Sequence, residues 1–429
     1  MIGIIFAPAS GIGGAISLIR ISGAGTDALI AALAGTLPKP RRAALRDFRA
    51  PDGTVLDRGI LLRFPAPNSY TGEDYAELHV HGGRAVRSAI ANALVALGAR
   101  PAEAGEFSRR AFGNGKLDLL EAEGIADLID AETEAQRRLA LDQAGGAMSR
   151  AIGAWREALV GLMARQAALI DFSDEDLPSE VEAAMLAAIA TLRDEIVAAL
   201  GAGTAAERLR EGIDIVVLGA PNVGKSTLVN AIAGEEVAIV SETPGTTRDA
   251  IGVRIDLGGV PVRLIDTAGL RESTDAIEAE GVRRARAHGA RADFLLLISA
   301  PPDFMAPEAP PGIETLLVAT KSDLPFAPPD NALAVSAKTG AGMATLIEIL
   351  KARVMDLTDR GAGPALPRPR QMTCLRDMVA ALDRAMAVSA PELRAEELQL
   401  AANAVARLTG VIGVEDVLDQ VFSSFCIGK

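Results

Sequence analysis

Two glycines, a lysine and a serine near the middle of the chain have the spacing of a phosphate-binding loop. Residues 219–226 read Gly-Ala-Pro-Asn-Val-Gly-Lys-Ser, which fits the pattern G-x-x-x-x-G-K-[ST]. The glycines let backbone N–H groups turn towards phosphates, Lys225 reaches the β- and γ-phosphates, and Ser226 offers its hydroxyl to Mg²⁺. An apolar run at 213–218 precedes the loop and a helical pattern follows it. The segment therefore predicts a nucleoside-triphosphate site between a strand and a helix.

Two further segments suit the metal and the γ-phosphate. An apolar strand, predicted at 262–265, ends in Asp-Thr-Ala-Gly at 266–269. An aspartate at a strand end can hold the Mg²⁺ shell through water, and the glycine N–H can bind the γ-phosphate. Between the two segments, residues 241–249 are rich in hydroxyls and suit a switch loop in which Thr247 closes on Mg²⁺. Taken alone, this loop reads equally well as an ordinary surface loop.

The base is selected by a carboxylate that follows the next predicted strand, 316–319. That strand leads into Thr-Lys-Ser-Asp at 320–323. A carboxylate can accept both N1–H and N2–H of guanine, whereas adenine offers an acceptor at N1 and has no 2-amino group. Asp323 therefore selects guanine, and a backbone N–H of the segment 336–338 can meet its O6. Five such segments in this order predict a GTP-binding domain.

The residues expected to contact GTP come from these five segments. They are Asn222, Val223, Gly224, Lys225, Ser226, Thr227, Ser241, Glu242, Thr243, Pro244, Gly245, Thr246, Thr247, Asp266, Thr267, Ala268, Gly269, Thr320, Lys321, Asp323, Ser336, Ala337 and Lys338. GTPases usually have Asn where Thr320 stands. We expect the threonine to weaken contact with the base without changing which base is bound.

The residue that orients the attacking water is not in its usual place. In Ras-like proteins a Gln follows the Asp-x-x-Gly segment, but here that position is Leu270, which has no polar group. Glu278, a few residues on, is our candidate, although by itself it also suits a solvated carboxylate at a helix start. Arg248 in the switch loop is the second candidate catalytic residue.

Composition favours a helical, multidomain protein. The chain has 429 residues, is 49% hydrophobic and only 3% aromatic, and carries a net charge of −13. Domains of ~100–200 residues predict two or three units. A protein that grips nucleic-acid backbone usually has a basic surplus, so any such contact should be local or made through a partner.

The cysteines and the N-terminus predict a cytoplasmic protein. Cys374 and Cys426 form neither a disulfide framework nor a zinc spacing, which fits a reducing compartment. The first 19 residues carry no charged side chain but are interrupted by Gly and Pro. They read as a buried strand and a glycine loop, not as a signal peptide or membrane helix.

Hydrophobic periodicity predicts an α/β plus all-α chain. Residues 1–116 mix strand-like runs (2–6, 15–21, 60–64 and 76–81) with a helical run at 84–97, helical spacing dominates 117–209, and strand and helix signals alternate over 210–357. A Pro/Gly linker leads to a second helical block within 365–429. We expect an α+β N-terminal domain, a helical domain in two parts, and a Ras-like, mostly parallel G domain inserted into it.

Segments outside the G motifs resemble one family closely. The chain contains Leu-Ile-Arg-Ile-Ser-Gly at 18–23, Tyr-Thr-Gly-Glu-Asp at 70–74, Gly-Glu-Phe-Ser-Arg-Arg-Ala-Phe at 105–112, and a terminal Cys-Ile-Gly-Lys at 426–429. With 77–83 and 114–118 these segments resemble the MnmE (TrmE) tRNA-modification GTPases over nearly the whole chain. Ordinary GTPases do not end in Cys-Ile-Gly-Lys.

The resemblance implies a folate site and a dimer. The N-terminal domain would form a homodimer and bind a 5-formyltetrahydrofolate-type cofactor through Arg20, Glu77, Lys116 and Lys429. Cys426 is either a nucleophile near the one-carbon site or a tail thiol without chemistry, and both readings stay open.

The resemblance also implies potassium activation in place of an arginine finger. The matching K⁺ positions are Asn222, Ser241, Thr243 and Thr246, with Ser226 and Thr247 for Mg²⁺. Glu278 matches the water-orienting carboxylate of the family.

The implied task needs a second protein. With an FAD-dependent partner of the MnmG (GidA) type, in a heterotetramer or larger assembly, the family adds an aminomethyl or carboxymethylaminomethyl group to C5 of the tRNA wobble uridine. Three rival readings are a ribosome-assembly GTPase of the Era or Der type, a one-carbon transferase regulated by its G domain, and a non-enzymatic scaffold gated by GTP.

Overall fold

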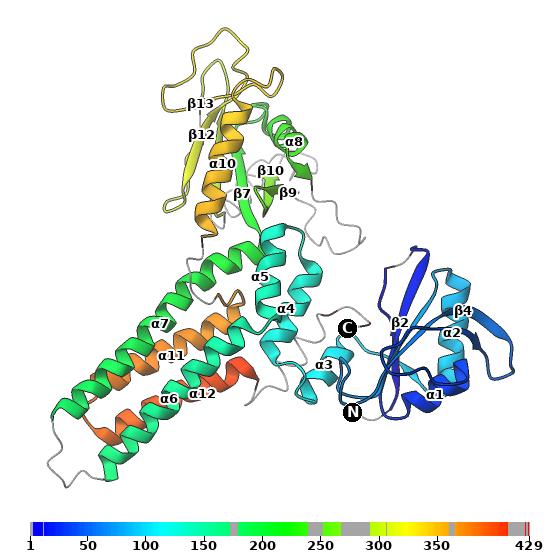
Figure 1. The fold of residues 1–429 in the computed structure, drawn as a ribbon. Coiled ribbons are helices and arrows are strands. Elements are labelled where there is room, and N and C mark those ends of the chain that lie inside the picture. The colour runs from blue at the N-terminus through cyan, green and yellow to red at the C-terminus, as the bar shows by residue number, and fades with distance from the viewer. Residues whose placement is uncertain are drawn as a thin grey trace, which may run out of the picture. The chain divides into compact units, whose positions relative to one another are not determined.

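The computed structural model describes residues 3–11, 13–171, 179–238, 252–266, 292–305, 307–359, 365–410, 425 and 428. These residues form two compact units (Figure 1). The first takes its described residues from Met1–Ala126, Gln143–Ile152 and Asn403–Lys429. The second takes them from Asp127–Asp142 and Gly153–Ala402.

The first unit is built on a mixed sheet. Within the described residues its strand order is β3-β4-β5-β2-β1-β6. The strands are β1 (Ile5–Pro8), β2 (Ile16–Ser22), β3 (Ala44–Arg49), β4 (Val55–Phe64), β5 (Tyr75–His81) and β6 (Arg100–Pro101). Neighbouring strands are antiparallel, except that β1 and β6 run parallel.

Alternation along the strands gives this sheet two different faces. Ile19 of β2 and Leu78 of β5 are paired and buried against α1 (Thr26–Ala34) and α2 (Arg84–Ala96). Their neighbours Arg20 and Glu77 are also directly paired and point to the other face, since successive side chains alternate. On that face Tyr75 packs with Phe107 of α3 (Glu106–Gly113).

A seven-stranded sheet forms the core of the second unit. Among the described residues its order is β13-β12-β11-β7-β10-β9-β8. The strands are β7 (Ile213–Gly219), β8 (Val237–Ala238), β9 (Gly252–Leu257), β10 (Val260–Asp266), β11 (Phe294–Ser299), β12 (Thr315–Ala319) and β13 (Leu333–Ala334). The five strands β13, β12, β11, β7 and β10 run parallel to one another. Strand β9 is antiparallel to β10, and β8 is antiparallel to β9.

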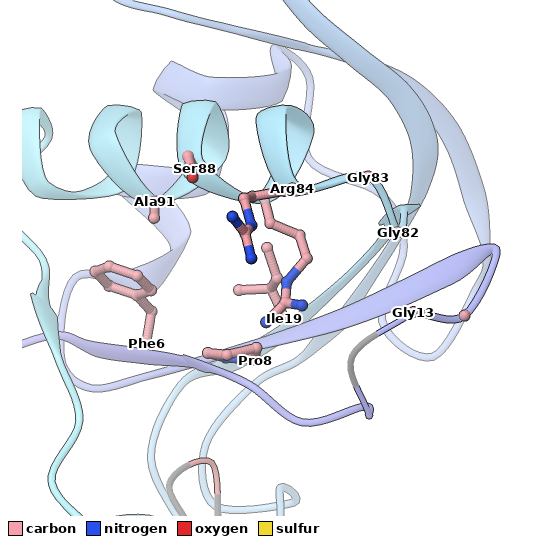
Figure 2. Close-up of a pocket in the computed structure, with 11 residues that line it drawn as sticks. Phe6, Pro8, Gly13, Ile19, Gly82, Gly83, Arg84, Ser88 and Ala91 are labelled. Atoms are coloured by element: carbon pink, nitrogen blue, oxygen red, sulfur yellow. The ribbon is translucent and has the colours of Figure 1, made fainter.

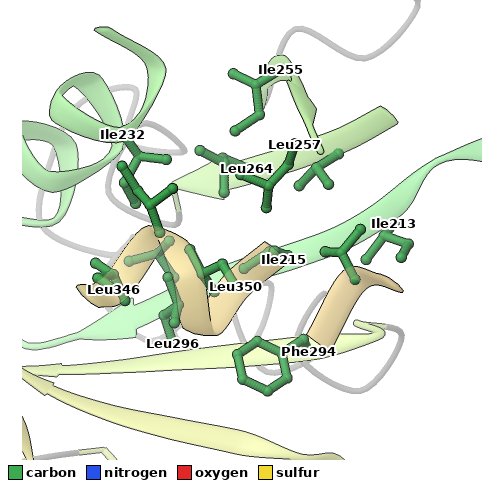
Figure 3. Close-up of a cluster of buried hydrophobic side chains, with 14 of the residues drawn as sticks. Ile213, Ile215, Ile232, Ile255, Leu257, Leu264, Phe294, Leu296, Leu346 and Leu350 are labelled. Atoms are coloured by element: carbon green, nitrogen blue, oxygen red, sulfur yellow. The ribbon is translucent and has the colours of Figure 1, made fainter. Parts of the chain in front are cut away.

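The central strand β7 places the phosphate-binding loop at the carboxyl edge of this sheet. Its continuous apolar run is buried from both sides, which is typical of a central parallel strand. Figure 3 shows Ile215 and Leu264 of the sheet in one cluster with Leu346 and Leu350 of α10 (Met343–Leu357). Because β10 and β11 lie on opposite sides of β7, the loop after β7 stands where the chain switches direction, which is where such sheets bind ligands.

The remaining helices of the described chain lie outside the two sheets. They are α4 (Leu119–Asp130), α5 (Glu134–Ala144), α6 (Ala147–Asp171), α7 (Ser179–Glu211), α8 (Lys225–Glu235), α11 (Pro369–Ala387) and α12 (Pro391–Thr409). Helices on either side of the G-domain sequence pack on each other. Arg193 of α7 pairs with Asp383 of α11 at 3.0 Å, and the buried Arg394 of α12 pairs with Glu182 of α7 at 2.9 Å. Among the described residues, no helix combines the length and apolar character that crossing a membrane requires.

Candidate nucleotide site and N-terminal pocket

The phosphate-binding loop has the predicted strand–loop–helix geometry. β7 ends at Gly219 and α8 begins at Lys225, with Gly224 in the left-handed region at φ 98°. A Cβ at Gly219 would lie 2.7 Å from the carbonyl oxygen of Ile298, so the neighbouring strand requires a glycine there. The Lys225 Nζ folds back over the loop and donates to the carbonyls of Gly219 at 3.0 Å and Ala220 at 2.9 Å.

Two oxygen ligands suited to Mg²⁺ meet beside this loop. The Ser226 hydroxyl donates to the Asp266 carboxylate, which stands at the end of β10. Hydroxyl and carboxylate oxygens are the donors that Mg²⁺ prefers, so the pair fits that ion. The described residues contain no cluster of three or more His, Cys, Asp or Glu side chains that could bind a metal by itself.

The residues predicted to bind guanine line one cavity of about 270 Å³. Its lining is Gly224, Thr227, Leu228, Thr320, Lys321, Asp323, Leu324, Ser336, Ala337 and Lys338. The Ser336 hydroxyl donates to Asp323 Oδ1 at 2.8 Å. This hydrogen bond lowers the pKa of the Asp323 carboxyl below its ordinary value, so the group is ionised at neutral pH. An ionised, oriented carboxylate is what recognition of guanine N1–H and N2–H requires.

Thr320 connects the base pocket to the phosphate loop. Its buried hydroxyl lies 2.5 Å from the carbonyl of Val223 and 3.1 Å from that of Ser299. A hydroxyl has one proton, and both neighbours are acceptors, so the Thr320 donor is used on backbone. Nearby, the Lys321 Nζ donates to the carbonyl of Asn222 at 2.9 Å. These two side chains hold the loop against the base pocket.

Replacing Thr320 with Asn is expected to tighten GTP binding by about two- to tenfold, the size of one additional neutral hydrogen bond. An amide can donate to the Val223 carbonyl and keep a second proton and an acceptor for the base. The measurement is the Kd for GTP by titration calorimetry. Thr320→Val, which keeps the shape and removes the hydroxyl, is the matched control and should bind more weakly than wild type. Weaker binding by the Asn variant would contradict this view of Thr320.

Several predicted residues lie outside the described part of the chain. They are Ser241, Glu242, Thr243, Pro244, Gly245, Thr246, Thr247, Arg248, Thr267, Ala268, Gly269, Glu278, Cys426 and Lys429.

A second candidate site lies on the face of the first sheet opposite α1 and α2. A cavity of about 230 Å³ is lined by Arg20, Arg41, Phe64, Ser69, Tyr70, Tyr75 and Glu77. The Arg20 Nε lies 3.9 Å from Glu77 Oε1, and the Tyr70 ring centre lies 5.8 Å from the guanidinium carbon. Burial raises the pKa of the Tyr75 phenol, which keeps its proton and donates to Glu77 Oε1 at 3.2 Å.

The C-terminal end of the chain also reaches Arg20. Its Nη1 donates to the carbonyl of Gly428 at 3.3 Å. Of the predicted folate residues, Arg20 and Glu77 are therefore together, next to the residue that precedes Lys429. Lys116 does not line this cavity. It lies beside Gly72: a Cβ atom placed on Gly72 would be 3.2 Å from the Lys116 Cε. Sequence reasoning did not single out the aromatic wall of Phe64, Tyr70 and Tyr75, although Tyr70 stands in a quoted motif.

A larger cavity, of about 630 Å³, lies on the other side of the same sheet. It is formed by the start of α2 and by strands β1 and β2, with Phe6, Pro8, Ile19 and Arg84 among its lining residues (Figure 2). None of the predicted site residues lines it.

The chain matches known proteins over nearly its whole length. Residues 4–116 match the family "GTP-binding protein TrmE N-terminus", and residues 119–426 match the family "MnmE helical domain". A relative from Acidiphilium cryptum, named tRNA modification GTPase MnmE, is 74% identical over 99% of this chain and 98% of its own. A relative of the same name from Granulibacter bethesdensis is 53% identical, over 99% of both chains.

Among solved structures, the G domain of the T. maritima FeoB iron transporter is 22% identical and covers 34% of this chain and 99% of its own, with a TM-score of 0.23.

The relatives from Acidiphilium cryptum and Granulibacter bethesdensis match this chain across its N-terminal segment, its nucleotide-binding segments and its C-terminal segment alike. The chain therefore belongs to the MnmE (TrmE) family of tRNA modification GTPases, and it is a GTP hydrolase.

Proposed function

We propose that this protein is a potassium-activated GTPase of the cytoplasm that adds an aminomethyl or carboxymethylaminomethyl group to C5 of the wobble uridine of certain tRNAs. It would work as a homodimer with an FAD-dependent partner of the MnmG (GidA) type, in a heterotetramer or larger assembly. The carbon would come from a 5-formyltetrahydrofolate-type cofactor. The observation that carries the proposal is the Arg20–Glu77 pair with Gly428 beside it, in a chain that also holds a guanine site.

The arrangement of the domains supports this assignment. The N-terminal sheet, with Arg20 and Glu77, would be the folate-binding and dimerisation domain. The contacts of α7 with α11 and α12 favour one helical domain, with the G domain inserted between its two parts. A nucleotide-driven change in the G domain would then act on helices that flank it in sequence.

The chemistry of the Arg20 pocket fits a folate. The Nε of Arg20 is buried and makes no hydrogen bond among the described residues, so a donor stands ready for an acceptor on a ligand. Phe64, Tyr70 and Tyr75 provide an aromatic wall, and Glu77 provides an acceptor. A folate has a planar pterin whose N–H groups suit a carboxylate and a glutamate tail that suits cations. The cofactor would supply the one-carbon unit, and these residues would bind and orient it.

In the G domain, the predicted site residues have separate tasks. Lys225 neutralises phosphate charge, Ser226 and Asp266 hold Mg²⁺, and Asp323 selects the base. Asn222 with Ser241, Thr243 and Thr246 would hold K⁺, which supplies positive charge near the β/γ bridge when it is bound. Glu278 would orient the attacking water, with Arg248 as the second catalytic candidate.

Replacing Arg20 with Ala is expected to weaken binding of 5-formyltetrahydrofolate by about 10- to 100-fold, since hydrogen bonds to charged groups are stronger than neutral ones. Titration calorimetry on the full chain measures the Kd. Arg58→Ala is the matched control, because Arg58 is an exposed arginine of β4 that does not line the pocket. Equal affinity in the Arg20→Ala variant and wild type would exclude this pocket as the folate site.

A further inference from the structure

Two segments of the first unit are locked together beside the Arg20 pocket. One is the loop 69–74, which is part of the connection between β4 and β5, and the other is the short helix α3. The Tyr70 and Ser108 hydroxyls lie 2.9 Å apart, and the Arg110 Nη1 donates to Glu73 Oε2 at 3.0 Å. Both contacts join residues more than 35 positions apart in sequence. The helix therefore fixes the loop at two points.

Arg110 is the centre of this arrangement. Its side chain is 1% exposed, and besides Glu73 it donates to Glu106 Oε1 at 3.0 Å and to the carbonyl of Gly3 at 3.0 Å. Burial acts to raise the pKa of Glu106, but hydrogen bonds from Arg100, the backbone and Arg110 outweigh it and keep the pKa below its ordinary value. Buried charges of this kind are stable only when they are paired.

The network reaches strand β2 next to Arg20. The Ser22 hydroxyl donates to Glu73 Oε2 at 2.9 Å and lies 2.7 Å from the Thr71 hydroxyl. The backbone N–H of Gly23 donates to the carbonyl of Asp74 at 3.0 Å. The loop is therefore held between α3 on one side and the end of β2 on the other.

This loop carries part of the Arg20 pocket. Ser69 and Tyr70 line the cavity, and the Tyr70 ring lies against the Arg20 guanidinium. An aromatic face that holds a cation restricts the directions in which that cation can donate. Glu73 lies three residues after Tyr70 in the same loop, and Tyr70 is in direct contact with Arg20.

We propose that Arg110 is a positioning residue of the Arg20 pocket: through Glu73 and the loop 69–74 it holds Tyr70 against Arg20 and so orients the cation that binds the folate. The ligand named here rests on the proposed function. Arg110 itself touches no ligand in this scheme. Its guanidinium serves three acceptors at once, which a lysine ammonium, a point charge on a flexible stem, cannot reproduce.

Arg110→Lys tests the proposal while keeping the buried positive charge. The matched control is Arg394→Lys, since Arg394 is also buried and paired with a glutamate but lies in α12. We measure the Kd for 5-formyltetrahydrofolate, hydrogen exchange of the amides at 69–76, the Tm and the rate of GTP hydrolysis, all on the full chain. Arg110→Lys should weaken folate binding about tenfold, the size of one hydrogen bond to a charged group, and speed exchange at 69–74. Arg394→Lys should change neither the Kd for folate nor the exchange at 69–74.

A double-mutant cycle separates positioning from a general loss of stability. If Arg110 acts through Tyr70, then Arg110→Lys should cost no further affinity in a Tyr70→Ala background. Independent, additive losses would overturn the proposal, and so would a lower Tm with an unchanged Kd. Should wild type fail to bind folate, the proposed folate function fails. Hydrogen exchange alone would then test whether Arg110 holds the loop. Unchanged exchange at 69–74 in Arg110→Lys would reject the role of Arg110.

Discussion

Asp323→Asn is expected to lower affinity for GTP by at least ~100-fold, because two hydrogen bonds to an ionised carboxylate are replaced by an amide that can make only one of them. The same variant should gain affinity for xanthosine triphosphate, whose C2 carbonyl accepts from the new amide. The structure supports a change of specificity without a change of fold. Asp323 stands in a preformed cavity with Ser336 and Lys338, and the Ser336 hydroxyl can donate to an amide oxygen as it does to the carboxylate.

The measurement is a pair of Kd values, for GTP and for xanthosine triphosphate, on the wild-type chain and the variant. Asp330→Asn, an exposed aspartate outside the cavity lining, is the matched control and should leave both values unchanged. A variant that keeps its GTP affinity and does not bind xanthosine triphosphate more tightly would contradict the assignment of Asp323.

The Asp323 carboxylate also predicts a pH dependence of GTP binding. Because the pKa of Asp323 is lowered, GTP affinity should be constant above that pKa and decline only as the pH falls through it.

Glu278→Ala should leave the Kd for GTP within about twofold of wild type and lower kcat about 100-fold or more, the usual size of a lost acid–base or water-orienting group. Glu278 lies outside the described residues, so this expectation rests on the sequence. The reason is chemical: Leu270 cannot orient water, and Glu278 is the carboxylate that matches the family's position. An interaction needed only during the reaction changes kcat and spares ground-state binding.

Multiple-turnover GTP hydrolysis in KCl and in NaCl checks this, with Glu280→Ala as the matched control two residues away. Wild type and the control should turn over faster in KCl, while Glu278→Ala should be slow in both salts. An unchanged kcat in KCl would remove Glu278 from the mechanism. Slow hydrolysis by wild type that is indifferent to the cation would instead favour a GTP-gated scaffold.

The sequence predicted the G domain well for a physical reason. Central parallel strands are buried on both faces and read as continuous apolar runs. The predicted runs 213–218, 262–265 and 316–319 are confirmed as parts of β7, β10 and β12. The residues that bind the ligand follow these strands directly, so finding the strand also places the loop. The helical run at 84–97 is likewise confirmed, as α2.

The N-terminal unit was predicted less completely because its signals are local and short. The helix α3 spans eight residues, too few for a clear helical period. β3 is an edge strand, in which Arg46 and Arg49 interrupt the apolar pattern. The predicted strand 60–64 is only the second half of β4. The tail predicted as one helical block is two helices in its described part, α11 and α12, with Pro391 at the start of the second.

The pocket around Arg20 depends on contacts that no local pattern encodes. Arg20 and Gly428 are 408 positions apart, and Tyr70 meets Ser108 across 38. Arg20 and Glu77 could be predicted from the family resemblance. The aromatic wall and the Arg110 network could be found only in the folded structure. Pairings between distant segments follow from packing of the whole unit, whereas a motif such as the phosphate-binding loop is contiguous.

The role in tRNA modification is tested by mass spectrometry of tRNA nucleosides from a strain lacking this gene, complemented with wild type, with Asp323→Asn or with empty vector. Wobble uridines substituted at C5 with aminomethyl-type groups should disappear in the deletion strain, return with wild type, and not return with Asp323→Asn. An unchanged nucleoside profile in the deletion strain would contradict the role in tRNA modification. The protein would then remain a GTPase, and ribosome assembly would become the leading alternative.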